Sequence, residues 1–219
     1  APDCPVPPGP FAWRVTRPPV LADLWETAAP AGAAFTTVAT WRNVGKDVEF
    51  RGERYVWSKD VNFRRFIDAP RRTGAAFEVA LESADLDAPA RLRARGWSVV
   101  EARAVSRDVE VYRDYVRGSR GEFTVAKDLV VRTRSGWFSD RSACYLAAGR
   151  PVITQDTGLG SHVPTGRGLF AFRTLDDVAA AVQAIAADPA RHAAAARELA
   201  REYFGAERLL GAILADAGV

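Results

Sequence analysis

Methionine is absent from this 219-residue sequence, and cysteine and histidine occur only twice each. Two cysteines, Cys4 and Cys144, are too few for a disulfide framework, so we expect free thiols and a cytoplasmic protein. His162 and His192 are too few and too isolated to indicate a metal site, and no bound metal is expected. Because a translated chain begins with Met, its absence at position 1 favours a piece of a longer protein.

An excess of one charge sign is also missing, since 30 Lys and Arg stand against 27 Asp and Glu. The two signs are interspersed, whereas nucleic-acid-binding proteins usually concentrate basic residues in one stripe, so no nucleic-acid partner is expected. Lysine itself is scarce, occurring only at positions 46, 59 and 127. The abundant arginine is typical of a solvated surface encoded by a GC-rich genome. No apolar run approaches the roughly 20 residues of a membrane span, and no signal segment is seen.

The distribution of proline divides the chain into two parts. Eight of the 13 prolines lie within residues 1–34, which excludes a long helix there and predicts a linker or a strap. Hydrophobic residues make up 48% of the sequence and charged residues 26%, an ordinary globular composition. We therefore expect one folded domain over residues 35–219.

Strand-like and helix-like segments alternate along this domain. Runs rich in β-branched and aromatic residues predict strands at 35–41, 76–81, 97–101, 123–126, 151–154 and 168–172. Apolar periodicity predicts helices at 59–67, 88–95, 109–116 and 139–148, and Ala-rich helices at 174–187, 189–203 and 206–217. Residues 42–57 are predicted to form a loop or hairpin. This alternation indicates an α/β fold, a Rossmann-like doubly wound parallel sheet with Ala-rich C-terminal helices. Such sheets bind ligands beyond the carboxyl ends of their strands.

Cations are expected at several of these strand ends. Arg42 follows the first strand, and Lys59 lies at the start of the next helix, which Ser58 could cap. A cation at a helix start opposes the helix dipole, so it favours an anion, such as phosphate, between the two. The alternative is an exposed surface lysine. Lys127 ends a later strand, where the alternative is a plain edge charge.

The segment from 134 to 152 carries the strongest signal. A Gly-containing turn leads into a helix that Ser139 or Asp140 could cap, and Arg141 in its first turn suits a diphosphate. The alternative is a purely structural loop and cap. No Gly-Lys-Ser or Gly-Lys-Thr occurs, so the segment is not a Walker loop. The candidate binding residues here are Gly136, Trp137, Phe138, Ser139, Asp140, Arg141 and Ser142.

This segment resembles the donor-binding region of GT-B glycosyltransferases that use nucleotide sugars. The likeness rests on two motifs. The first is a turn that opens a helix, Ser135-Gly136-Trp137-Phe138-Ser139, and the second is the start of the strand after that helix, Gly149-Arg150-Pro151-Val152. Residues 36–158 as a whole resemble an actinobacterial-type branch of these enzymes. The resemblance implies a nucleoside-diphosphate sugar as substrate, no separate cofactor, and contacts from Arg42 and Lys59 to the diphosphate.

The resemblance also implies what this chain lacks. The two glutamates that contact the donor sugar and ribose in the family align with Gly136 and Cys144, and Asp140 is the nearest acid that could substitute. A GT-B enzyme has two Rossmann-like domains, and this chain matches the C-terminal, donor-binding half, so an N-terminal acceptor-binding domain is expected as its partner. Two alternatives stay open: a non-catalytic sugar-nucleotide-binding or interaction module, and an epimerase of similar fold.

Overall fold

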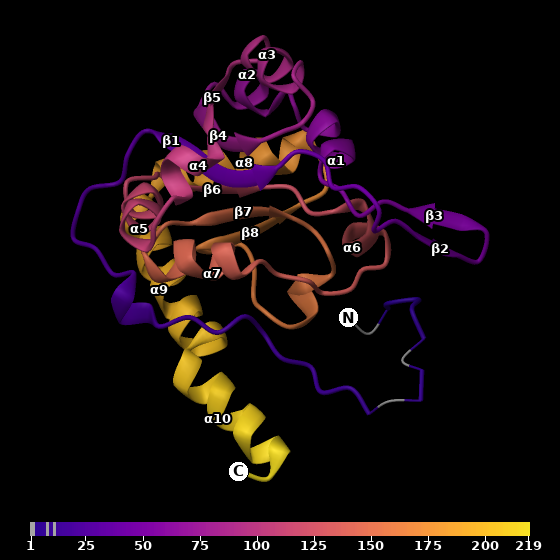
Figure 1. Ribbon diagram of the computed structural model, residues 1–219. Coiled ribbons are helices and arrows are strands. Elements are labelled where there is room, and N and C mark those ends of the chain that lie inside the picture. The colour runs from indigo at the N-terminus through magenta and orange to yellow at the C-terminus, as the bar shows by residue number, and fades with distance from the viewer. Residues whose placement is uncertain (1–2, 8, 11) are drawn as a thin grey trace.

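A computed structural model describes residues 3–7, 9–10 and 12–219. In these residues six parallel strands form one sheet in the order β5-β4-β1-β6-β7-β8, shown in Figure 1. The first strand in sequence lies in the middle, and the chain builds outward from it first on one side and then on the other. This order reverses direction between β1 and β6, so the expected doubly wound, Rossmann-like fold is confirmed.

The strands follow the β-branched and aromatic runs of the sequence. Their bounds are β1 Ala34–Thr40, β4 Ala76–Glu82, β5 Trp97–Glu101, β6 Gly121–Thr124, β7 Val152–Gln155 and β8 Leu169–Phe172. Strand β1 pairs along its whole length with β4, from Ala34 opposite Ala76 to Thr40 opposite Glu82. It pairs more briefly with β6.

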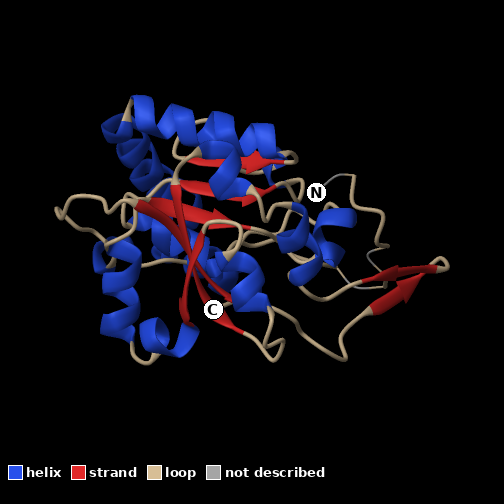
Figure 2. Cartoon of the chain, turned by 90° about the horizontal axis from the view of Figure 1, so that it is seen from above, coloured by secondary structure: helices blue, strands red, loops and turns tan. Residues whose placement is uncertain are grey.

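Helices cover both faces of the twisted sheet, as Figure 2 shows. One face carries an aromatic core around Phe35, Phe77 and Phe123, against which pack α1 Asp60–Arg65, α2 Ala69–Thr73, α3 Ala88–Arg93 and α8 Leu175–Ala187. The core of the other face includes Tyr145 and Phe204, and is closed by α5 Val109–Arg117, α7 Asp140–Ala147 and α9 Pro189–Phe204. Burial on both faces explains why the strands are nearly continuous apolar runs.

The N-terminal segment runs along the second face and meets the C-terminal helices. Its described residues include a short 3-10 helix, Ala22–Leu24. The Val20 amide donates to the Phe204 carbonyl, and the Ala206 amide donates to the Val20 carbonyl, at 2.8 and 3.0 Å. These bonds hold the junction between α9 and α10 Ala206–Ala217. Ala1, Pro2, Pro8 and Phe11 of the expected Pro-rich segment lie outside the described residues.

Three short helices and a hairpin refine the predicted pattern. Residues 42–57 form a hairpin of β2 Val48–Phe50 and β3 Glu53–Tyr55, and α4 Ala102–Ser106 and α6 Asp128–Arg132 were not predicted. The helix predicted at 59–67 is confirmed in shorter form as α1, which ends at Arg65, and a second helix that was not predicted, α2, begins at Ala69 with Pro70 in its first turn. Proline fits a helix start as well as it stops a helix. In the described part of the chain no helix is long and apolar enough to cross a membrane.

Candidate functional site

A cleft of about 310 Å³ opens at the carboxyl ends of β1 and β4, beside the point where the strand order reverses. Helices α1 and α6 and the β2–β3 hairpin gather at this edge of the sheet, as Figure 1 shows. The cleft is therefore where a doubly wound sheet is expected to bind a ligand. The residues that line it are Val38, Ala39, Thr40, Asn43, Lys59, Glu82, Ala102, Ser106, Lys127 and Arg141.

Lys59 is the most unusual side chain of the cleft. The residue is only 8% exposed, and within the described residues its ammonium group has neither a hydrogen bond nor an ion pair. Burial, together with the positive charge of the nearby Arg141 guanidinium, lowers the pKa of Lys59 from 10.5 to about 7. A largely buried cation without a partner is costly, so an anion in the cleft would stabilise this position.

The backbone around Lys59 is fixed by Ser58. The Ser58 hydroxyl donates to Asp60 Oδ1 at 2.7 Å and lies 3.3 Å from the Trp41 carbonyl oxygen, and it accepts from the Asn43 amide at 3.3 Å. Ser58 was predicted to cap α1, and this is wrong: Lys59 is the N-cap residue, and no side chain caps the helix. Ser58 instead ties the start of α1 to the end of β1.

Arg141 forms a buried ion pair beneath the cleft. Its Nε donates to Glu122 Oε1 at 2.6 Å, and its two terminal nitrogens donate to the Val38 carbonyl at 2.8 Å and the Thr124 hydroxyl at 2.9 Å. Burial alone would lower the pKa of Arg141, but the Glu122 carboxylate raises it above its ordinary value. A guanidinium has five N–H donors, and two are left without a partner in the described structure, on a residue that lines the cleft.

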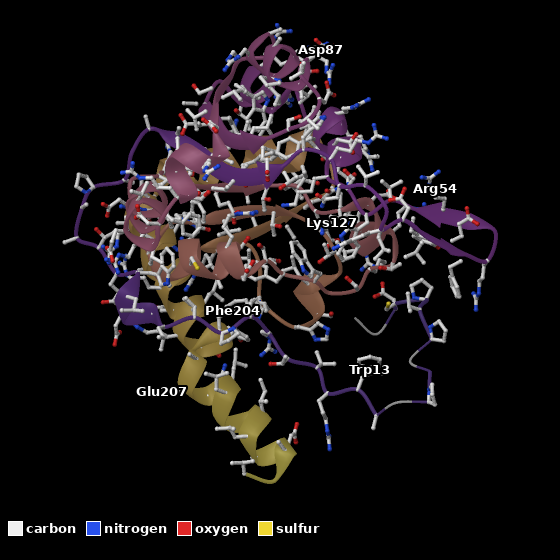
Figure 3. The ribbon with its side chains drawn as sticks, in the orientation of Figure 1. Trp13, Arg54, Asp87, Lys127, Phe204 and Glu207 are labelled. Atoms are coloured by element: carbon white, nitrogen blue, oxygen red, sulfur yellow. The ribbon has the colours of Figure 1, made fainter. Side chains whose placement is uncertain are left out.

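Lys127 supplies the third cation, at the N-cap of α6. Its ammonium lies 3.7 Å from the centre of the Trp57 ring, and Figure 3 places it between the sheet and the hairpin that carries Arg54. Partial burial lowers the pKa of Lys127, as does the positive charge of Lys46. Hydrogen bonds hold the loop on both sides, from Asn62 Nδ2 to the Ala126 carbonyl at 2.9 Å and from the Val56 amide to Asp128 at 3.1 Å.

Sequence reasoning placed Arg42 at the site, but Arg42 is exposed and is not among the described residues that line the cleft. Its neighbour Asn43 lines the cleft instead. Glu82 and Ser106 also line it and were not predicted. Glu82 directly follows the strand predicted at 76–81, so its position at a strand end was the available signal. Ser106 lies in α4, a helix that the sequence pattern did not reveal.

The predicted turn at Gly136 to Phe138 lies in a neighbouring hollow. The Gly136 amide donates to the Thr157 carbonyl at 2.8 Å, and the Phe138 ring stacks on Phe204 with centroids 4.7 Å apart. Gly136, Trp137 and Phe138 line a cavity of about 560 Å³, which residues 15–18 of the N-terminal segment also border. The structure therefore separates this turn from the residues that line the cation-rich cleft.

The start of α7 connects the two hollows. Ser139 is its N-cap residue, without a side-chain cap bond, and its hydroxyl bonds Asp140 Oδ1 at 3.2 Å. The same Asp140 oxygen accepts from the Arg141 amide at 2.9 Å. The Ser142 hydroxyl is buried and has no partner among the described residues. Asp140 is exposed and does not line the cleft in the described structure.

Neither a metal-binding cluster nor a disulfide is seen at the site. The described residues hold no group of three or more His, Cys, Asp or Glu that could bind a metal ion. Cys4 and Cys144 are free thiols, and burial raises the pKa of Cys144 to about 12. Cys144 is therefore a poor nucleophile at neutral pH.

The fold is similar to solved structures of sugar-transferring enzymes. The C-terminal domain of a group 1 family glycosyl transferase (LpcC) from Francisella tularensis matches with a TM-score of 0.58 and 13% identity, over 85% of this chain and 98% of that domain. AviGT4, a glycosyltransferase involved in avilamycin A biosynthesis, matches with a TM-score of 0.58 and 16% identity, over 94% of this chain and 58% of its own. TarM matches with a TM-score of 0.56 and 12% identity, over 86% of this chain and 36% of its own.

These comparisons establish the class of fold, the Rossmann-like α/β fold of GT-B glycosyltransferases. This chain spans about a third of the length of TarM and just over half of that of AviGT4. No protein-family model matches the sequence, and no curated protein matches it.

Proposed function

We propose that this chain is the donor-binding domain of a GT-B glycosyltransferase, and that its cleft binds the diphosphate of a nucleotide sugar. The observation that carries the proposal is Lys59, a largely buried residue at the start of α1 that lines the cleft and whose ammonium group has no partner among the described residues. A diphosphate would provide the negative charge that this site lacks. The resemblance of residues 134–158 to the donor-binding region and the fold of the solved neighbours support the same function.

In the proposed reaction the bond between the anomeric carbon of the sugar and the β-phosphate oxygen breaks. A new bond forms from that carbon to an acceptor hydroxyl, whose proton passes to a base, and the nucleoside diphosphate leaves. Negative charge grows on the leaving phosphate, and preorganised cations stabilise it. Lys59 and Lys127 would do so directly, and Arg141 through its two remaining donors. The acceptor site and the base would belong to the expected N-terminal domain.

A second candidate function is a sugar-nucleotide-binding module that does not catalyse transfer. It is favoured by Gly136 and Cys144, which stand where the resemblance expects carboxylates and which do not line the cleft in the described structure. Formation of a glycosylated product by the full-length protein would separate the two functions. A cytoplasmic location and membership of an actinobacterial-type branch stay predictions from the sequence.

Isothermal titration with UDP and dTDP tests the proposal. We expect at least one to bind at millimolar concentration or below, and Lys59→Ala and Lys127→Ala to weaken binding by about tenfold or more, because hydrogen bonds to charged groups are strong. Lys46→Ala is the matched control, since Lys46 is exposed and lies outside the described cleft lining. No binding of either nucleotide, or equal weakening by Lys46→Ala, would contradict the proposal.

A further inference from the structure

The cleft contains one feature that a phosphate-binding site does not need. The Glu82 carboxylate lines it together with Lys59, Lys127 and Arg141. A carboxylate repels a bound diphosphate, so it weakens phosphate binding unless it contacts another part of the ligand. The position of Glu82 therefore gives information about the group that the diphosphate carries.

Glu82 is the last residue of β4 and pairs in register with Thr40 at the end of β1. The Thr40 hydroxyl donates to Glu82 Oε2 at 3.2 Å. Oε1 has no partner within the described residues, so the carboxylate retains an accepting oxygen on a residue that lines the cleft. Strand β4 flanks β1 on one side and β6 flanks it on the other. Glu82 thus lies on the opposite side of β1 from the strand that leads to Lys127.

Two other acidic groups lie near the cleft but do not line it in the described structure. Glu122 is fully buried, and its Oε1 pairs with Arg141 while its Oε2 has no partner among the described residues. Asp140 is exposed and accepts hydrogen bonds from its own neighbours, Ser139 and Arg141. Among the described residues that line the cleft, Glu82 is the one carboxylate. A hydroxyl group is the natural partner, because an ionised carboxylate only accepts hydrogen bonds.

We propose that Glu82 accepts a hydrogen bond from a ligand hydroxyl and selects ligands in which a polyhydroxylated ring is attached to the diphosphate. The ring is either the ribose of the nucleotide or the transferred sugar, and the chemistry of recognition is the same in both. This inference rests on the proposed diphosphate site. Glu82 is a specificity-determining residue, because it contacts a ring hydroxyl that takes no part in the bonds made and broken.

The test compares four probes, namely pyrophosphate, 2′-deoxy-UDP, UDP and UDP-glucose, by isothermal titration against wild type, Glu82→Ala and Glu82→Gln. Glu101→Ala is the matched control, because Glu101 ends the neighbouring strand β5, is exposed and lies outside the described cleft lining. Thermal unfolding confirms that the variants are folded, and the exposure of Glu82 makes a large loss of stability unexpected.

We expect Glu82→Ala to weaken the binding of the ligand whose ring hydroxyl contacts Glu82 by roughly tenfold or more. Pyrophosphate should bind as well as before or better, because the substitution removes a repulsive charge. Gln retains an oxygen acceptor, so Glu82→Gln should lose less affinity than Glu82→Ala. If the ribose is the partner, wild type prefers UDP to 2′-deoxy-UDP and Glu82→Ala loses that preference. If the transferred sugar is the partner, Glu82→Ala weakens the binding of UDP-glucose and leaves the affinity for the other probes unchanged.

Two results would overturn the inference while leaving the diphosphate site intact. One is unchanged binding of all four probes by Glu82→Ala, and the other is a loss shared equally by pyrophosphate. Failure of wild type to bind any probe would instead overturn the proposed function, and with it the assignment of Glu82.

Discussion

The Arg141 guanidinium pairs with the Glu122 carboxylate, 2.6 Å from Nε to Oε1, and Glu122 is completely buried. The pair joins the first turn of α7 to β6, and the bond from Arg141 to the Val38 carbonyl adds β1. Arg141 was predicted from sequence to hold a diphosphate. The structure gives it a second task, because three of its donors fasten the two strands between which the sheet reverses direction.

Loss of this pair should strongly destabilise the fold. Arg141→Met leaves the Glu122 charge buried without a partner, and we expect the free energy of unfolding to fall by about 3–5 kcal/mol, measured by urea denaturation. Replacing Glu122 with Leu in the same protein should recover much of this loss. The control is Arg72→Met, which removes an exposed pair with Asp176 and should cost less than about 1 kcal/mol. Equal effects of the two Arg variants would contradict the buried pair.

Lys59→Met should change stability and binding in opposite directions. The folded-state pKa of about 7 lies below the ordinary 10.5, so folding below pH 7 requires burial of a charge, and this penalty disappears as pH rises towards 10.5. Removing the amine should raise the free energy of unfolding at pH 6 by on the order of 1–3 kcal/mol, with no gain above pH 10.5. The same variant should lose nucleotide affinity. A loss of stability at pH 6 would show that the charge is well accommodated without a ligand.

Nucleotide binding should depend on pH through the same amine. Above pH 7 the phosphates are already ionised, whereas free Lys59 loses its proton, so UDP affinity should fall by up to tenfold per pH unit between pH 7 and 9. Titrations in buffers of different ionisation enthalpy would detect the proton taken up on binding. Lys59→Met should remove most of this dependence. A wild-type affinity that is constant over this range would argue against contact between Lys59 and the phosphates.

Gly168 should be sensitive to a single added methyl group. A Cβ there would lie 2.5 Å from the Ala196 amide nitrogen of α9, whereas a Cβ on Gly166 would meet nothing within 4 Å. Both glycines have positive φ, at +70° and +100°, so alanine costs backbone strain at each. Gly168→Ala should lower the melting temperature more than Gly166→Ala does, because the added methyl group overpacks the site at a cost of about 1–3 kcal/mol. Equal melting temperatures of the two variants would contradict the close approach of β8 and α9.

The sheet could be predicted because its information is local. Most of the buried strands are short runs rich in β-branched and aromatic residues, and each long helix has a clear period, so the α/β alternation follows directly from the sequence. The short helices α2, α4 and α6 could not be recognised in this way. Each has at most five residues, too few for a period to show, and Pro70 was interpreted as a stop when it occupies a helix start.

The site was only partly predictable, because it depends on side-chain direction. The position of Lys59 and Lys127 at strand or helix ends brought them correctly to one cleft. Arg42 follows the same strand as Asn43, yet only Asn43 lines the cleft in the described structure. The partner of Arg141 could not be found either, since Glu122 lies 19 residues away and meets it only because α7 packs beside β6.

The hydrogen bonds between Val20 and the junction of α9 and α10 have a mechanical consequence. They join a segment near one end of the chain to a segment near the other. A force that separates these two segments therefore loads two backbone hydrogen bonds together. The N-terminal segment thus acts as a clamp on the junction between α9 and α10, and bonds from Arg117 to the Leu24 and Trp25 carbonyls anchor it to α5 as well.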